Sequence, residues 1–179
     1  MKCLTEFVLC LLTLVLYSCS PSTQNQAVSL GELRFNTTDA SEIYFNNVRR
    51  SYYDLKELKD QGLNYYYPKY DINTSAFLEP YLVLNWRRDQ AYIMLGGSEN
   101  IEEVILKVNS DSSSIRSLRL ITPIDQTQFS IEVYNSLVQR DTLYYLDQKN
   151  DWNPLFGDEE VKERFRITCY DFLRLVEMK

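Results

Sequence analysis

Hydrophobic and polar positions alternate along the middle of the chain in a pattern that predicts two hairpins. Apolar runs at 81–86 and 91–95 flank a short polar turn, and runs at 104–108 and 115–121 flank a second polar segment. Two β-rich runs around a short polar connection are typical of an antiparallel hairpin. The sequence therefore predicts four strands in succession, although residues 101–108 also fit the spacing of a helix.

The segments before these hairpins give weaker patterns. Residues 28–36 alternate and predict a short strand. Residues 42–58 combine a helical stripe with local alternation, and we predict a helix that ends near Gly62. The aromatic run 63–70 contains Pro68, which favours an edge strand or an extended loop.

Helical periodicity follows the second hairpin. Pro123 and Asp125 predict the start of an amphipathic helix that continues to about Arg140. Residues 150–154 read as a loop, and Gly157-Asp158 is typical of the cap of a final helix. The expected buried stripe of that helix is Val161, Phe165, Thr168 or Cys169, Phe172 and Val176, with Arg164, Arg166 and Arg174 facing water. The elements together predict an α+β domain, an antiparallel β meander of about four to six strands covered by two or three helices.

The N-terminal residues have the layout of a secretory signal. Lys2 is followed by an apolar run at 7–16 and then by Tyr17-Ser18-Cys19. The motif Leu16-Tyr17-Ser18-Cys19 resembles the lipobox of bacterial lipoproteins, with a hydrophobic residue three positions before the cysteine and a small residue directly before it. The expected organisation is a signal peptide at 1–18, a flexible tether at 19–27 and a single domain at 28–179.

The lipobox resemblance implies where the protein is found. In that family the cysteine thiol receives a diacylglycerol and the signal is removed, so Cys19 would become the first residue of a chain anchored in a bilayer. The apolar run is about half of the ~20 residues that a membrane-spanning helix needs, which favours lipid anchoring over a transmembrane anchor. No acidic residue follows Cys19 in the tether. In such lipoproteins this favours the outer membrane, facing the periplasm.

Composition narrows the chemistry of the domain. The chain has a net charge of −6, no histidine and four cysteines. Without histidine it lacks the usual base near neutral pH and the commonest transition-metal ligand, so we expect no metal and no cofactor. The acidic balance argues against a nucleic-acid partner. If Cys3 and Cys10 leave with the signal and Cys19 is acylated, Cys169 remains as a small buried residue.

Tyrosine is the most unusual component, with fourteen residues in 179. Tyrosine and tryptophan combine an apolar face with a polar handle, which suits partner binding or stacking on sugars. The candidate binding surface consists of Tyr65, Tyr66, Tyr67, Tyr70, Trp86 and Trp152. The alternative is that these rings fill the core. Consecutive residues of a strand point to opposite faces, so at most part of the run can form one surface.

Other residues allow less specific chemistry. Carboxylates occur together at Asp54 and Glu57, at Glu102 and Glu103, and at Asp158, Glu159 and Glu160, and arginines at 49–50 and 87–88. Such groups more often form solvated faces or helix ends than a paired acid and base. Asp141-Thr142-Leu143 resembles the tripeptide at which some gram-negative bacteria O-glycosylate exported proteins.

These observations favour a non-enzymatic, membrane-anchored lipoprotein that binds another envelope protein. An inhibitor or immunity-type lipoprotein, whose acidic surface neutralises a basic enzyme, is the first alternative. A carboxylate-based glycan hydrolase is the second.

Overall fold

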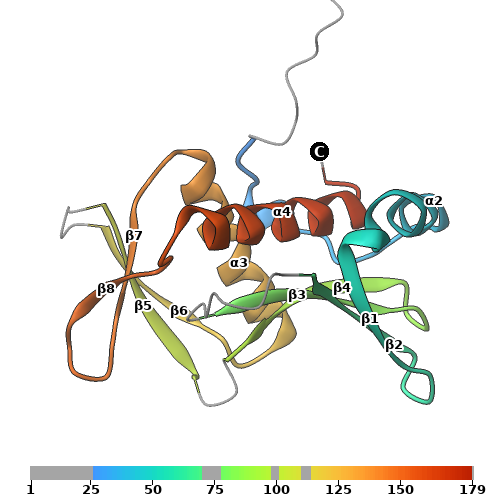
Figure 1. Cartoon of the computed structure of the whole chain (residues 1–179), viewed down its shortest axis with the longest axis horizontal. Helices are drawn as coiled ribbons and strands as arrows, with labels where there is room; N and C mark the ends of the chain where they lie inside the picture. The colour runs from blue at the N-terminus through green and yellow to red at the C-terminus, as the bar shows by residue number, and fades with distance from the viewer. Residues whose placement is uncertain (1–25, 70–77, 98–100, 110–113, 179) are drawn as a thin grey trace, which may run out of the picture.

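The computed structural model describes residues 26–69, 78–97, 101–109 and 114–178 (Figure 1). The predicted signal peptide, Cys19 and Tyr70 lie outside these residues. Among the described residues, strands form two four-stranded antiparallel sheets and helices pack beside them. The predicted α+β class, with an antiparallel strand meander and helices, is confirmed.

The first sheet follows chain order. Its strands are β1 (Tyr53–Leu58), β2 (Leu63–Pro68), β3 (Glu79–Asn85) and β4 (Gln90–Gly96). Leu82 of β3 pairs with Ile93 of β4, which confirms the first predicted hairpin. Gly62, in the turn between β1 and β2, has a positive φ of 73°. Glycine adopts that conformation without a steric cost, so it suits this turn.

The second sheet places its strands in the order β6-β5-β7-β8. These strands are β5 (Glu103–Val108), β6 (Ile115–Arg119), β7 (Leu143–Leu146) and β8 (Trp152–Pro154). Val104 pairs with Leu118, so the second predicted hairpin is confirmed and the helical alternative for 101–108 is wrong.

The two long helices begin where the capping residues predict, and a short helix precedes them. They are α2 (Asp39–Tyr44), α3 (Pro123–Val138) and α4 (Glu159–Leu175). Thr122 and Asp125 form a reciprocal capping box at the start of α3, and the Asp158 side chain accepts a hydrogen bond from the Val161 amide at the start of α4. The two predicted long helices are confirmed within two residues of their expected ends.

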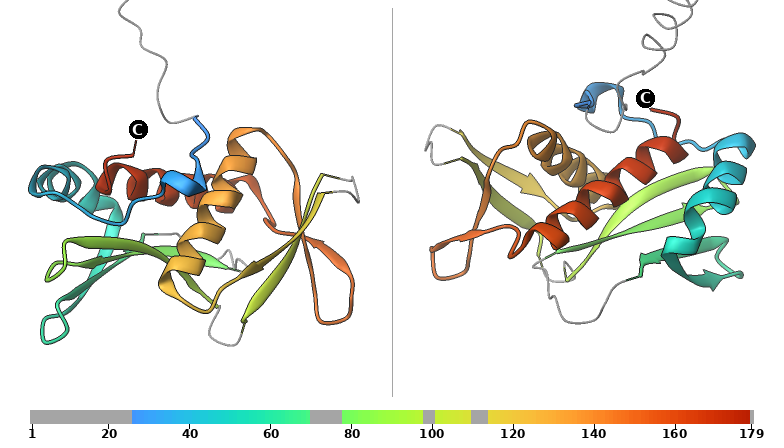
Figure 2. Two further views of the ribbon diagram at one scale, coloured as in Figure 1. Left: turned by 180° about the vertical axis from the view of Figure 1, so that it is seen from behind. Right: turned by 45° about the horizontal axis from the view of Figure 1, so that its top comes forward.

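One hydrophobic core joins the helices to both sheets. α4 crosses β3 and β4, while α3 contacts β4 and β6. Figures 1 and 2 show α2 and α4 on one side of the first sheet and α3 beside it, with the other face of the sheet turned away from α4. Phe129, Phe165, Phe172 and Leu82 are among the fully buried side chains of this core. Cys169 is buried there as predicted.

The structure corrects two predictions near the N-terminus. Residues 28–36 form no strand: they contain a 3-10 turn at Leu30–Glu32 and one isolated bridge between Asn36 and Gln90. The predicted helix over 42–58 is wrong in its second half. α2 continues through a π-helical turn, Phe45–Arg49, and a 3-10 turn, Arg50–Tyr52, and the chain then enters β1. Ile43 and Phe45, whose alternation resembled that of a strand, lie in helical turns, and the strand begins only at Tyr53.

Three further predictions are corrected. The tyrosine-rich strand β2 lies between β1 and β3 rather than at an edge. Pro68 is tolerated because it is the last residue of β2 and pairs only with Tyr53. Residues 152–154 are not loop but the short strand β8, paired with β7. Arg164 and Arg166 are mostly covered, with side chains 14% and 18% exposed, and they pair with Glu160 and Glu163 on the same helix.

Candidate binding surface

The consecutive tyrosines of β2 divide between the two faces of the first sheet. Tyr66 points inward, is 2% exposed, and has its ring 5.0 Å from that of Phe45. Tyr65 and Tyr67 point to the opposite face, as strand alternation requires. The sequence prediction that only part of the run shares a surface is therefore correct, and Tyr66 belongs to the core.

Tyr81 of β3 joins the two outward tyrosines. The ring centroids of Tyr65 and Tyr67 are 6.4 Å apart with planes 11° from parallel. The Tyr81 centroid lies 4.8 Å from that of Tyr67 and 6.2 Å from that of Tyr65. We call Tyr65, Tyr67 and Tyr81 the tyrosine face. Its members come from neighbouring strands, which is why the chain sequence alone did not group Tyr81 with the others.

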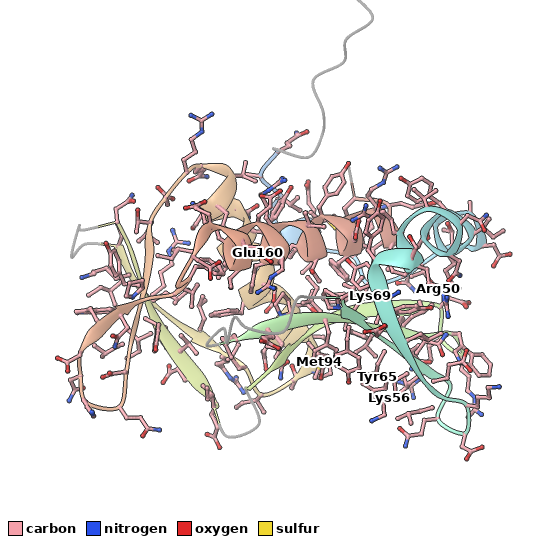
Figure 3. All side chains as sticks on the ribbon, viewed as in Figure 1. Arg50, Lys56, Tyr65, Lys69, Met94 and Glu160 are labelled. Atoms are coloured by element: carbon pink, nitrogen blue, oxygen red, sulfur yellow. The ribbon has the colours of Figure 1, made fainter. Side chains whose placement is uncertain are left out.

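The tyrosine face is partly open to solvent and has charged residues of both signs beside it. Tyr67 is 38% exposed. Lys56 pairs with Tyr65 and Asp54 pairs with Tyr67 on β1, so one cation and one carboxylate flank the rings. Figure 3 shows Lys56, Tyr65 and Met94 on the side of the sheet turned away from α4. The surface thus offers apolar ring area with hydroxyl and charged groups around it.

Partial burial affects the phenol of Tyr67. Burial, with a smaller contribution from the neighbouring Tyr65, raises the pKa of Tyr67 above its ordinary value. The hydroxyl therefore stays neutral at physiological pH and acts as a hydrogen-bond donor and acceptor. A neutral ring with such a handle is suited to contact with a partner surface.

The remaining predicted aromatics lie elsewhere. Trp86 is at the turn between β3 and β4, 45% exposed, with the Arg87 guanidinium 5.4 Å from its ring centroid. Trp152 is on β8 of the second sheet, where the Lys107 ammonium lies 4.5 Å from its ring centroid. Of the five predicted aromatic residues that the structure describes, it brings together Tyr65 and Tyr67.

A buried polar cluster lies on the helix side and was not predicted. Asp171 of α4 is 1% exposed, accepts a 2.6 Å hydrogen bond from the Tyr53 hydroxyl and a 2.8 Å hydrogen bond from Arg49 Nε. Burial raises the pKa of Asp171, although Tyr53 and Arg49 act in the opposite direction. The only sequence signal was a carboxylate beside Cys169 and Phe172 on the apolar stripe of the last helix. The cluster connects the π-helical turn and β1 to α4 through hydrogen bonds, so we interpret the cluster as structural.

The carboxylate groups singled out in the sequence have local partners. Asp54 lies 4.0 Å from Lys69, and Glu57 lies 3.6 Å from Lys59. Glu103 accepts a hydrogen bond from Ser117. In the first turn of α4, Glu159 and Glu160 pair with Lys162 and Arg164.

The other candidates are dispersed. Arg49 belongs to the buried cluster, whereas Arg50 and Arg88 are exposed. The Arg87 guanidinium donates to the Lys59 carbonyl at 3.4 Å. Thr142 is exposed just before β7.

Within the described ranges, no three cysteine, aspartate or glutamate side chains are grouped as metal ligands. No helix in the described part of the chain combines the length and apolar character needed to cross a bilayer. Comparisons with the profiles of known families, with curated proteins and with solved structures find no match.

Proposed function

We propose that this protein is a lipid-anchored, non-enzymatic binding module that engages another envelope protein through its tyrosine face. The observation that supports this most is the grouping of Tyr65, Tyr67 and Tyr81 on the outer face of a sheet whose inner face forms the core. Exposed tyrosines offer contact area at a low cost in side-chain entropy, and they are frequent energetic centres of protein interfaces.

The path of the N-terminal segment agrees with such an arrangement. The Val28 amide donates to Asn135 Oδ1 at 2.7 Å, and Asn135 Nδ2 donates to the Val28 carbonyl at 2.8 Å. Asn135 is on α3, so the chain enters the domain on the helix side (Figure 2). Residues 19–25 can span at most about 25 Å when extended. An anchor at Cys19 would therefore hold the helix side near the bilayer and leave the tyrosine face directed away from it.

Copurification from envelope extracts tests the binding surface. We expect the wild-type chain to retain a partner that the double variant Tyr65→Ser/Tyr67→Ser loses by at least ~10-fold, since interface tyrosines contribute upwards of ~1.4 kcal/mol. The matched control is Tyr52→Ser/Trp86→Ser, which removes two aromatic residues that are 58% and 45% exposed elsewhere. Equal recovery with both double variants, or no partner with the wild type, would contradict the proposal.

The anchor has a separate test. We expect the mature N-terminus to be an acylated Cys19 by mass spectrometry, and globomycin to leave the signal attached. Cys19→Ala should abolish lipidation and release the domain from membranes. An unmodified chain that starts at Met1, or membrane association unchanged by Cys19→Ala, would contradict lipid anchoring.

A further inference from the structure

A cavity opens on the helix side, where the N-terminal segment meets α3 and α4. Its volume is about 700 Å³, within the range of small-molecule sites. Residues 26–29 form one wall, and Tyr134 of α3 and Leu173 of α4 line it from the domain. The hydrogen bonds between Val28 and Asn135 fix the first wall against the second.

Two arginines of this cavity form no salt bridge among the described residues, although Arg174 acts on the Asp171 carboxyl through longer-range electrostatics. Salt bridges there involve neither Arg34 nor Arg174, and neither guanidinium donates a hydrogen bond within the described part of the chain. The Arg174 guanidinium lies 4.2 Å from the Tyr44 ring centroid and 5.8 Å from that of Tyr170. These rings restrain its position and leave its donors available.

The rest of the lining mixes polar residues, such as Gln26 and Ser29, with apolar ones. Tyr134 and Leu173 are buried at 0% and 3% exposure, and Met178 also lines the cavity. Burial raises the pKa of Tyr134 to about 12, so its phenol stays neutral. Glu32 is the one acidic side chain in the lining, against two arginines. Two arginines in the lining of a cavity that also contains apolar side chains suit a molecule with an anionic head and an apolar body.

We propose that this cavity binds an amphipathic anion, with a phosphate or carboxylate held by Arg34 and Arg174 and an apolar portion against the half-buried Val28 and Met178. Phosphate could come from a phospholipid headgroup or from a free phosphorylated molecule. The cavity does not include the tyrosine face, so this inference does not rest on the proposed protein partner.

Calorimetric titration of the purified full chain tests it with three probes. These are inorganic phosphate, dihexanoyl phosphatidylglycerol below its micelle concentration, and dihexanoyl phosphatidylcholine, which has the same chains on a head of no net charge. We expect saturable binding of phosphatidylglycerol, at least ~10-fold tighter than binding of phosphatidylcholine. Binding of inorganic phosphate with the same affinity as phosphatidylglycerol would overturn the proposal, because the apolar portion would then contribute nothing.

Two variants assign the binding to the cavity. Arg34→Gln/Arg174→Gln should weaken it by at least ~10-fold, whereas Arg88→Gln/Arg119→Gln, the same charge change at exposed sites elsewhere, should not. Ser29→Trp fills the cavity from an exposed position and should also block binding. The proposal is overturned if no probe binds at millimolar concentration, if both lipids bind equally, or if the two double arginine variants behave alike.

Discussion

At the residue scale, Tyr66 and Tyr67 are neighbours of one type in opposite environments. Tyr66 contacts Phe45 and Tyr53 in the core, while Tyr67 contacts Tyr65 and Tyr81 on the outer face. Strand alternation predicts that the two side chains differ, but it does not predict which of them points inward. That depends on the α2 and π-helical segment, whose Phe45 closes over the inner face of the sheet.

The two tyrosines should respond differently to truncation. Tyr66→Ala should lower the free energy of unfolding by about 3 to 5 kcal/mol, because it leaves a cavity under a fully buried ring. Tyr67→Ala should cost about 1 kcal/mol or less, since the ring is partly exposed. Urea denaturation of both variants measures this. Similar losses for both would contradict the assigned faces.

The buried cluster around Asp171 should stabilise the fold as a unit. Asp171→Ala leaves the Tyr53 hydroxyl and the Arg49 guanidinium without their acceptor, and we expect a loss of about 3 kcal/mol or more. Combining it with Arg49→Met should cost less than the sum of the single changes. A double-mutant cycle by urea denaturation gives this coupling. Additive effects would show that the two side chains are independent.

The same carboxyl gives a pH dependence of known sign. Burial raises the pKa of Asp171 in the folded protein above the ordinary value of 3.8. In the pH window between the unfolded and the folded pKa, the native state therefore holds more protons than the unfolded chain. Its contribution to the free energy of unfolding therefore falls as pH rises through the window. The advantage of the wild type over Asp171→Asn should be larger near pH ~3.5 than near pH ~7. An advantage that grows with pH would mean that the pKa is lowered instead.

At the scale of elements, α3 closes the edge of the first sheet. The Ile93 amide of β4 donates to Thr127 Oγ1 at 3.0 Å, and the Leu95 amide donates to Gln126 Oε1 at 2.8 Å. Nearer the start of β4, the Ala91 amide donates to the Phe35 carbonyl at 2.8 Å. Side chains of a helix and a short extended segment thus replace a neighbouring strand, which protects the edge from pairing with another chain.

Thr127→Val tests this edge. Valine keeps the shape of threonine but leaves the buried Ile93 amide without an acceptor, so we expect a loss of about 1 to 3 kcal/mol in the free energy of unfolding. Faster hydrogen exchange at the Ile93 amide should accompany it. Thr142→Val makes the same change at an exposed site and should cost about 0.5 kcal/mol or less. Equal effects would contradict the role of Thr127.

The elements that the sequence predicted are those whose signals are local. The two hairpins and both long helices follow from turn residues, caps and periodicity. The strands β7 and β8 did not, because each is short: β7 depends on pairing with the distant strand β5, and β8 pairs only with β7. Residues 28–36 alternate like a strand, yet the edge that they would extend is already occupied by α3 over much of its length.

At the scale of the molecule, the two proposed binding sites lie on opposite sides of the first sheet. The tyrosine face lies on the outer side of the first sheet, while the N-terminal segment and the arginine-lined cavity lie on the helix side. The sequence predicted the aromatic residue types and part of the surface. It could not predict the grouping with Tyr81 or the presence of Arg34 and Arg174 in one cavity, because these depend on strand register and on how the two ends of the domain pack.

Site-specific photo-crosslinking in the native cell tests the central claim most directly. Tyr67→p-benzoylphenylalanine places the reactive group on the tyrosine face, and Glu159→p-benzoylphenylalanine places it at an 88% exposed position on α4. We predict a discrete covalent adduct with one envelope protein from position 67 and none with that protein from position 159. No adduct from position 67, or the same adduct from both positions, would contradict the account.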